Sequence, residues 1–514
     1  MKRLVFLLIC WLVVPPLAPA QENPLPTELH DLEAYVQQAM QQWGVPGLSM
    51  AITYRGKVVY LKGFGVRENG KPDPVDGNTV FAVGSNTKAF TALMVSQLAH
   101  EGKLALDDQV TKYWPDFSLN DPSATALLTI RDLLTHRIGL GTWHGDLVAW
   151  GSTYSREDLI RMYHHIKPVY SFRSGFGYQN VAFLAAGELA AKRVGTSWDD
   201  WVMNRIFKPL AMSRSTTHFA DLAGMDNVAA PHTADYDGKL HVIPYRNIDN
   251  IAPAGSITSS AADMAHWIIM QADSLGRYDG REVFKPLVIK RTHYLNNPIP
   301  YTPYDNPTYP ETHLGGYGLG WFMRDYHGKM LYEHGGGVDG MISQTGFMPE
   351  LNLGWVILSN RDTGNSLPTA LMYHIVDAYL GLPRKDWSAF FLRAEKQNEA
   401  QTQQQWNAEL RKKDPSKIPT LPYADYAGTY EHPHYGQVEI GLDGDGLFIR
   451  PQAHPGVVGR LTHWVQDRFL VTFNDLEFGR AFMPFKVENG RVVSFEVSIR
   501  PEFLDPLTYT FTRK

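Results

Sequence analysis

The segment FAVGSNTKAFTALMVSQLAHEGKL, residues 81–104, places Ser85 three residues before Lys88 at the start of an apolar stretch. The following apolar residues recur at helical spacing, and a glycine closes the pattern: Phe90, Leu93, Met94, Leu98 and Gly102. We therefore expect a helix that begins at or near Ser85. Residues three positions apart share one helical face, so Lys88 is expected to approach the Ser85 hydroxyl.

A serine at this place has two explanations. It can be an ordinary helix N-cap, because a serine side chain accepts a hydrogen bond from the first turn. It can also be a nucleophile, provided that a neighbouring base takes its proton. Lys88 could act as that base if burial lowers its pKa, and the first N–H groups of the helix would suit a developing oxyanion. The rest of the chain has to decide between the two.

Two further motifs favour the nucleophile. S-x-x-K opens the catalytic motif set of β-lactamases and penicillin-binding proteins, which also carry S-D-N and K-T-G elements. In this chain SGFGYQNVAF contains the Y-x-N sequence Tyr178-Gln179-Asn180, and LYEHGGGVDGM contains the H-x-G sequence His334-Gly335-Gly336 at the end of an expected strand. Both motifs follow Ser85 in the order that the family uses.

These motifs, with the phrases LLTHRIGL, IFKPLAM, PAGSITSSAADMAHW, YGLGWF and GWVILSN, resemble the class C β-lactamase-like serine hydrolases of peptidase family S12. That group includes D-alanyl-D-alanine carboxypeptidases, D-aminopeptidases and some esterases. The resemblance covers roughly residues 27–382. The tail from about residue 423 more loosely resembles the lipocalin-like domain found at the C-terminus of some members.

The resemblance implies roles for the motif residues. Ser85 would be the acylated nucleophile. Lys88 and Tyr178 would share proton transfer, with either the lysine or a tyrosinate as the general base. Asn180 would hydrogen-bond the amide or acyl side chain of the substrate.

The third motif would complete the site on its strand. Gly335 and Gly336 would let the substrate lie close along the strand edge, where side chains would block it. The N–H groups of Ser85 and Gly337 would form the oxyanion hole. His334 stands where β-lactamases carry the K-T-G lysine that helps to hold the drug's carboxylate. It would contribute hydrogen bonding, or positive charge if protonated, but a histidine is shorter and mostly neutral at pH 7. This departure favours a peptidase or an esterase over an efficient β-lactamase.

The chain order predicts an α+β fold. We expect a β-lactamase/transpeptidase-like domain over residues 21–382, in which an antiparallel sheet from both ends of the domain is flanked by helices and a helical subdomain. Within it, we expect a helix over about 29–44, a hairpin over 48–65 and a mostly helical region over 85–275. Residues 278–315, rich in Pro, Tyr and Asn, would form a long surface loop that could act as a lid. A strand meander begins at 317. A helical linker over 383–420 and an antiparallel, lipocalin-like β-barrel over 421–514 would follow.

The N-terminus predicts export. MKRLVFLLICWLVVPPLAPA carries two basic residues, a short apolar run and an A-x-A site, which is typical of a cleavable signal peptide over residues 1–20. The run is too short to span a bilayer, and no later segment is apolar enough to do so. Cys10 is the only cysteine, so the mature chain would have no disulfide or thiolate site. We expect a periplasmic or secreted protein.

Composition excludes other classes. The net charge of −5 gives no basic surface for nucleic acid. Four histidines outside the third motif are candidate metal ligands: His136, His144, His164 and His165. They form no convincing set of ligands, so we expect no metal and no cofactor. We expect His136 to have a structural role.

The sequence thus predicts an exported serine hydrolase that cleaves an amide or ester bond through an acyl-serine intermediate. Its substrates would be small peptides, amides or esters. A peptidase or amidase acting on D-amino-acid or cell-wall-type peptides and a carboxylesterase both stay open. Three alternatives also stay open: a penicillin-binding-like sensor or scaffold with little turnover, a weak β-lactamase, and a carbohydrate-binding protein in which the barrel is the active part.

Overall fold

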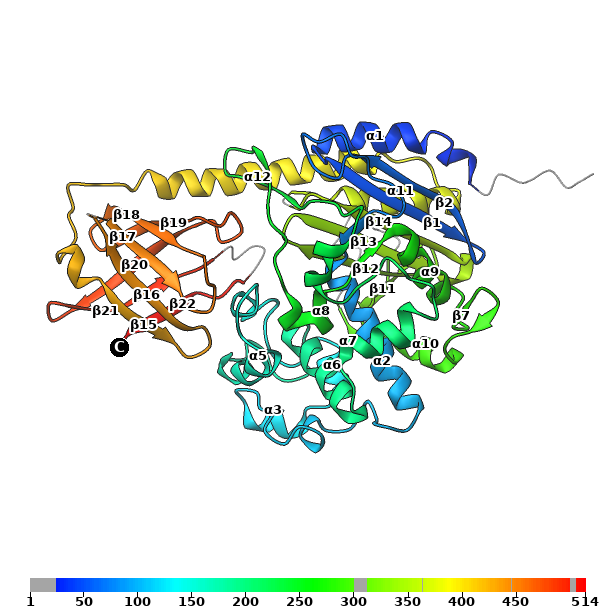
Figure 1. Ribbon diagram of the computed structural model, residues 1–514, viewed down its shortest axis with the longest axis horizontal. Helices are drawn as coiled ribbons and strands as arrows, with labels where there is room; N and C mark the ends of the chain where they lie inside the picture. Colours follow the sequence, from blue (N-terminus) through cyan, green and yellow to red (C-terminus); the bar gives the residue numbers. More distant parts are fainter. Residues whose placement is uncertain (1–24, 300–311, 363, 445, 500–504) are drawn as a thin grey trace, which may run out of the picture.

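The computed structural model describes residues 25–299, 312–362, 364–444, 446–499 and 505–514 (Figure 1). The predicted signal peptide, residues 1–20, lies outside this part of the chain. Among the described residues, the largest sheet is antiparallel, with the strand order β2-β1-β14-β13-β12-β11-β10-β9. Its strands are β1 (Gly47–Tyr54), β2 (Lys57–Gly65), β9 (Asn297–Pro298), β10 (Gly315–Tyr317), β11 (Phe322–Tyr326), β12 (Lys329–Val338), β13 (Met341–Met348) and β14 (Leu353–Ser359).

The predicted hairpin and meander are both present. β1 and β2 are joined at Arg55 and Gly56, whose φ angles of 51° and 74° give the left-handed turn that suits a two-residue hairpin loop. β1 also pairs with β14, so that Ala51 lies opposite Val356. The sheet is therefore built from both ends of the domain, as the sequence predicted.

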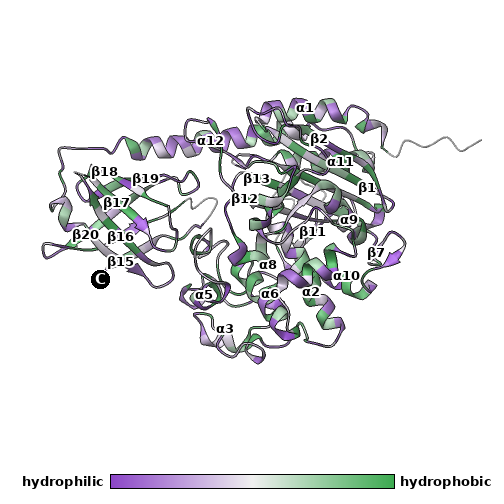
Figure 2. Ribbon diagram, viewed as in Figure 1, coloured by the Kyte–Doolittle hydropathy of each residue, from purple (hydrophilic) through white to green (hydrophobic). Residues whose placement is uncertain are grey.

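Both faces of the sheet are covered. Met50 and Ile52 on β1 pack into a core with α1 (Leu32–Trp43) and α11 (Leu367–Leu380), whereas Ala51 points into the larger core on the opposite face. The long helix α12 (Trp387–Leu410) begins on the same face as α1 and α11 (Figure 1). Because both faces are buried, the central strand β14, with the sequence LGWVILS, is mostly apolar and buried along its whole length. Figure 2 shows hydrophobic residues, in green, on the strands of the sheet and on the helices beside it.

The second face carries the helical region that the sequence predicted for 85–275. Helix α2 lies at its centre and packs against α6 and α8 (Figure 1). The helices are α2 (Thr87–His100), α3 (Pro122–Leu127), α4 (Ile130–Leu133), α5 (Arg156–Met162), α6 (Asn180–Val194), α7 (Trp198–Val202), α8 (Ala252–Gly255) and α9 (Ala261–Ala272). Two small sheets, β3 (Val80–Ala82) with β6 (Thr258–Ser260) and β4 (His232–Ala234) with β5 (Leu240–Val242), complete it.

The predicted surface loop over 278–315 is wrong for much of its length. The segment holds the hairpin β7 (Arg277–Tyr278) and β8 (Arg281–Glu282), then α10 (Pro286–Thr292), and then β9 of the main sheet. Val288 and Ile289 on α10 are fully buried, and α10 packs against α2. The proline content of the segment favoured a loop, but Pro286 lies in the first turn of α10, where a proline starts a helix rather than breaking it. The proposed lid would involve residues 300–311, which lie outside the described residues.

Helix α12 leads into a closed antiparallel barrel that contains, among the described residues, the strands β15 to β22 in sequential order. They are β15 (Gly428–His432), β16 (Gly436–Asp443), β17 (Gly446–Pro451), β18 (Gly459–Val465), β19 (Arg468–Phe473), β20 (Arg480–Glu488), β21 (Arg491–Val497) and β22 (Tyr509–Arg513). Aromatic rings fill the interior: Tyr430 and Phe485 both contact Phe495, which stacks on Phe511. The predicted barrel is confirmed.

The barrel packs against the domain that contains the main sheet, and polar contacts join the two. Arg246 forms ion pairs with Asp339 of the β12–β13 turn and with Asp475 of the barrel, and the Asp339 side chain is only 1% exposed. The Thr153 N–H donates to the Ala453 carbonyl at 2.9 Å. In the described part of the chain no helix is long and apolar enough to cross a membrane.

Candidate active site

Ser85 lies in a tight turn between β3 and α2. The turn, η2 (Gly84–Asn86), is a 3₁₀ turn that runs directly into α2, so the predicted helix start is confirmed. The Ser85 side chain does not cap the helix, which removes the simpler explanation for the residue. Gly84 has φ = 52°, a conformation that favours glycine.

Lys88 is buried in the first turn of α2 with no exposed surface. Its Nζ lies 3.0 Å from Ser85 Oγ, and it donates to Asn180 Oδ1 at 2.6 Å and to the Ala254 carbonyl at 2.8 Å. Burial lowers the pKa of Lys88 to about 7, although the Asp146 carboxylate acts in the opposite direction. A large fraction of the lysine is therefore neutral near pH 7, as a base for Ser85 must be.

Tyr178 lies beside this pair. Lys88 Nζ is 4.7 Å from the centre of the Tyr178 ring, and the phenol hydroxyl is buried without a regular hydrogen bond among the described residues. Burial raises the pKa of Tyr178, and the nearby Ser85 only partly opposes this effect. A tyrosinate is thus disfavoured, and the geometry favours Lys88 over Tyr178 as the base, an alternative that the sequence left open.

His136 holds Tyr178 in place, in line with the expected structural role. The two rings stack with centres 4.3 Å apart, and His136 Nδ1 accepts the Gln179 N–H at 3.0 Å. The loop before Tyr178 is fixed by Arg173, which pairs with the fully buried Asp132, as Arg137 also does.

Asn180 begins α6 and points toward Lys88. Its amide nitrogen donates to Asp146 Oδ2 at 2.6 Å. Asp146 is buried, and burial together with the nearby Asp505 raises the pKa of its carboxyl to about 7. Sequence reasoning missed Asp146, because it lies in the loop GTWHGDLVAW, outside every motif. An acidic residue in a loop rich in aromatic residues was the only available signal.

His334 lies on β12 and is almost completely buried. The Tyr317 hydroxyl lies 3.1 Å from His334 Nε2, and Nδ1 lies 2.6 Å from the Gly335 carbonyl. Burial, helped by the charge of Lys88, lowers the pKa of His334 to about 3. His334 is therefore neutral at physiological pH and supplies no positive charge to the site.

Gly335, Gly336 and Gly337 continue β12 along the site. From His334 to Val338 the strand pairs with β13 alone in the described part of the chain, since its pairing with β11 ends at Glu333. The other edge of this half-strand therefore has no strand partner among the described residues, which is what the proposed substrate contact requires.

The structure adds a reason for Gly336 and for Gly84. A Cβ on Gly336 would lie 2.0 Å from the Val83 carbonyl oxygen, so this glycine lets β12 pack on the turn that carries Ser85. A Cβ on Gly84 would lie 2.8 Å from the Gly337 nitrogen. The Gly337 amide is therefore next to the Ser85 turn, where the expected oxyanion hole would lie.

These groups line a pocket of about 440 Å³. Its lining includes the motif residues Ser85, Tyr178, Asn180, His334, Gly335, Gly336 and Gly337, together with Asp146 and an apolar set that the motifs did not reveal: Trp143, Trp150, Phe176, Ile248, Ile251, Phe322 and Ile342. Among the described residues, no arginine or lysine lines this pocket.

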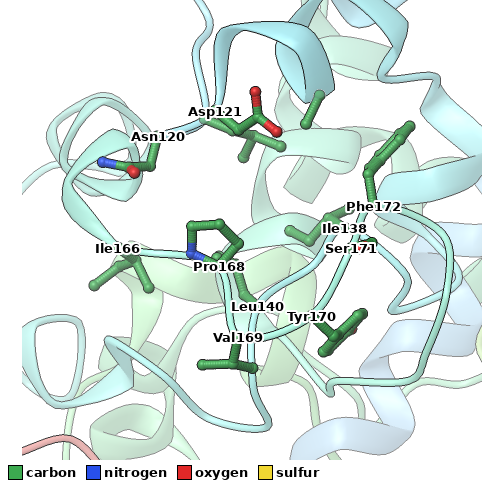
Figure 3. A pocket seen from close by; sticks show the side chains of 12 residues that line it. Asn120, Asp121, Ile138, Leu140, Ile166, Pro168, Val169, Tyr170, Ser171 and Phe172 are labelled. Carbon is green, nitrogen blue, oxygen red and sulfur yellow. The ribbon is translucent and has the colours of Figure 1, made fainter.

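A second pocket of about 400 Å³ shares no lining residue with the first, and Figure 3 shows the side chains that line it. It is formed by the segment Pro168–Phe172 and by Asn120 and Asp121, and none of the three motifs contributes to it. Across the described ranges, no cluster of three or more histidine, cysteine, aspartate or glutamate side chains could hold a metal ion.

Known proteins resemble this chain along most of its length. An unguisins hydrolase of Aspergillus violaceofuscus, ungD, is 28% identical over 453 residues, which cover 80% of this chain and 76% of the relative. Protein flp of Staphylococcus aureus is 27% identical and covers 65% of this chain and 63% of the relative. The fold matches that of an octameric penicillin-binding protein homologue from Pyrococcus abyssi, with a TM-score of 0.63 and 22% identity, over 94% of this chain and all of that one.

Two family models match the chain. The model of a domain of unknown function (DUF3471) matches residues 412–511, which include the barrel. The beta-lactamase model matches residues 32–380, the part that contains the main sheet, α2 and all three motifs. The chain therefore belongs to the beta-lactamase family, as a β-lactamase-like serine hydrolase with a closed barrel at its C-terminal end.

Proposed function

We propose that this protein is an exported serine hydrolase that cleaves an amide or ester bond through an acyl-serine intermediate. The observation that carries the proposal is the fully buried Lys88, whose Nζ lies 3.0 Å from Ser85 Oγ and whose pKa burial lowers to about 7. A neutral amine at this distance can take the serine proton, which is the requirement for a serine nucleophile.

The proposed reaction has two steps. Ser85 Oγ attacks the carbonyl carbon while its proton passes to Lys88, and the oxyanion lies between the N–H groups of Ser85 and Gly337. The carbon–nitrogen or carbon–oxygen bond then breaks, and the leaving group takes the proton from Lys88, directly or through the Tyr178 hydroxyl. Water next attacks the acyl carbon, gives its proton to Lys88, and releases the acid as Ser85 regains its proton.

The pocket supports substrates without a carboxylate near the scissile bond. A buried carboxylate needs a positive partner. The described residues that line the pocket include no arginine or lysine, His334 is neutral, and Asp146 adds a carboxyl group. The apolar lining suits an uncharged or aromatic group, and the open edge of β12 can pair with an extended backbone. These features favour an internal amide or an ester over a carboxypeptidase substrate, and they argue against efficient turnover of anionic β-lactams.

Turnover is favoured over a silent sensor or scaffold. The three motifs meet in one pocket, and the relative from Aspergillus violaceofuscus is named a hydrolase. Whether the physiological substrate is a D-amino-acid peptide, a cell-wall-type peptide or a carboxylic ester is the question for a substrate panel.

The test is hydrolysis by the mature protein, with Ser85→Ala as the control. The panel contains a short-chain nitrophenyl ester, D- and L-aminoacyl anilides, a chromogenic cephalosporin, and one D-dipeptide both as free acid and as amide. We expect Ser85-dependent cleavage, with kcat/KM for the dipeptide amide at least about tenfold above the free acid, a difference of about 1.4 kcal/mol. Equal activity of Ser85→Ala would refute the nucleophile, and a preference for the free acid would refute the carboxylate argument.

A covalent probe separates a slow enzyme from a binder. A fluorophosphonate should add once to the wild-type protein and not to Ser85→Ala, as intact mass spectrometry would show. Absence of both labelling and turnover would favour the sensor or scaffold.

We also propose a periplasmic or secreted location from residues 1–20, and the test is N-terminal sequencing of the exported protein, which should begin after Ala20.

A further inference from the structure

We propose that Asp146 is a positioning residue that orients Lys88 through Asn180, and that the C-terminal barrel holds Asp146 in place. The inference rests on the proposed serine-hydrolase function. Neither the three motifs nor the family resemblance assigns a role to Asp146 or to the barrel.

The first observation is a chain of hydrogen bonds. Asp146 Oδ2 accepts from the Asn180 amide nitrogen at 2.6 Å, and Asn180 Oδ1 accepts from Lys88 Nζ at 2.6 Å. In its ionised form Asp146 can only accept hydrogen bonds, so the carboxylate fixes which end of the Asn180 amide faces Lys88. With the pKa of Asp146 raised to about 7, this form is present at neutral pH and above. Without that acceptor the amide could turn its NH₂ group toward the lysine and leave the amine without its partner.

This orientation matters for the base. A neutral amine has two protons and one lone pair. If Asn180 Oδ1 and the Ala254 carbonyl, 2.8 Å away, accept the two protons of Lys88, the lone pair points to the third neighbour, Ser85 Oγ. Asp146 thus aims the lone pair of Lys88 at the hydroxyl through Asn180.

The second observation is that the barrel binds the residues on both sides of Asp146. Asp505, just before β22, accepts from the Leu147 N–H at 3.1 Å and from the Tyr509 hydroxyl. The two ring nitrogens of His434, in the β15–β16 turn, lie 3.0 Å from the carbonyl oxygens of Gly145 and Met162. Asp505 and His434 have no exposed surface. The short turn that carries Asp146 is therefore held by two buried barrel side chains.

The electrostatics agree with this geometry. Besides Asn180, the groups that face Asp146 are Lys88 and Asp505, together with three buried tyrosines whose pKa it raises: Tyr163, Tyr178 and Tyr509. The charge of Asp146 raises the pKa of Lys88 against the larger effect of burial. Removing this charge should therefore lower the pKa of Lys88, whereas a purely structural change would leave it in place.

The decisive experiment uses Asp146→Asn and Asp146→Ala in the full-length protein, with a nitrophenyl ester that the wild-type protein cleaves. The alanine variant loses the acceptor, and we expect kcat to fall about tenfold to a hundredfold with KM changed less than about threefold. The asparagine variant keeps the shape and one acceptor oxygen. We expect its acid limb in the pH profile of kcat/KM to move to lower pH, because Lys88 loses a negative neighbour.

Rates are divided by the fraction of active sites, counted from fluorophosphonate labelling, so that partial unfolding is not read as slow catalysis. An unchanged kcat in Asp146→Ala, or an unmoved acid limb in Asp146→Asn, would overturn the positioning role. Should the alanine variant not fold, the isosteric asparagine variant decides through its pH profile.

The barrel contribution is tested with Asp505→Ala, which removes the acceptor for the Leu147 N–H. The matched control is Asp443→Ala at the end of β16. This change removes a surface ion pair with Arg460 of β18, another barrel strand. We expect kcat to fall at least about threefold in Asp505→Ala and to stay unchanged in the control. Equal rates for the two variants would overturn the role of the barrel. A wild-type protein with no Ser85-dependent turnover and no labelling would instead refute the proposed function itself.

Discussion

Raising the pH through about 7 should activate Ser85, because Lys88 loses its proton in that range. Lys88 has no exposed surface, and burial lowers its pKa from 10.5 to about 7. At 1.36 kcal/mol per pKa unit, the shift corresponds to about 5 kcal/mol of disfavoured charge on the buried amine. An ordinary lysine would be neutral in roughly 1 molecule in 3,000 at pH 7, whereas roughly half of the Lys88 side chains are neutral there.

The direction in which the rate changes with pH follows from the role of the Lys88 amine as a base. The neutral form accepts the Ser85 proton, so kcat/KM should rise about tenfold per pH unit below the pKa and level off above it. The assay is the acylation rate with a nitrophenyl ester between about pH 5 and about pH 9, corrected for spontaneous hydrolysis. His334 does not titrate in this range, since burial holds its pKa at about 3. Asp146 does, and Asp146→Asn removes its contribution.

Two variants make the reasoning refutable. Lys88→Arg introduces a side chain that stays protonated and cannot act as a base. We expect kcat/KM to fall by about a hundredfold or more at every pH. Tyr178→Phe should lower the rate by about a hundredfold as well but keep the acid limb near pH 7, because Lys88 remains the base. A flat wild-type profile, or a limb that disappears in Tyr178→Phe alone, would refute Lys88 as the base.

Further variants test the packing that supports the site. Gly336→Ala should abolish most fluorophosphonate labelling, because its Cβ would lie 2.0 Å from a backbone oxygen of the Ser85 turn; Gly335→Ala, whose Cβ would meet only a flexible side-chain end at 3.2 Å, should still fold, and equal labelling of the two would contradict this. Arg246→Ala should cost about 3–5 kcal/mol in denaturant unfolding, since Asp339 stays buried without its cation; a cost below about 1 kcal/mol, the range of surface pairs, would contradict it. Asp132→Asn should lose stability at neutral pH. Burial opposes ionisation of Asp132, but its hydrogen bonds lower its pKa overall, so the wild-type advantage should shrink as the pH falls through this pKa, and thermal unfolding at several pH values measures it.

The sequence by itself determined the local features that carry the chemistry. Helical spacing after Ser85 placed Lys88 one turn away, and the structure finds the two side chains 3.0 Å apart. Alternating strands and turn residues predicted the hairpin, the meander and the barrel, because these patterns act over a few neighbouring residues. The loop expected over 278–315 was wrong where α10 begins, because a proline is favoured in the first turn of a helix but disrupts the middle of one.

Only the tertiary structure decided what surrounds those residues. The pKa of Lys88 depends on burial by α6, α8 and the sheet, and burial is a property of the whole fold rather than of any spacing. Asp146 reaches Asn180 from a loop without a motif, and Asp505, over 350 residues further along the chain, fixes that loop from the barrel. Such contacts join segments that share no sequence pattern, because chain folding alone brings them together. The motif residues could therefore be read from the sequence, whereas the groups that orient them could not.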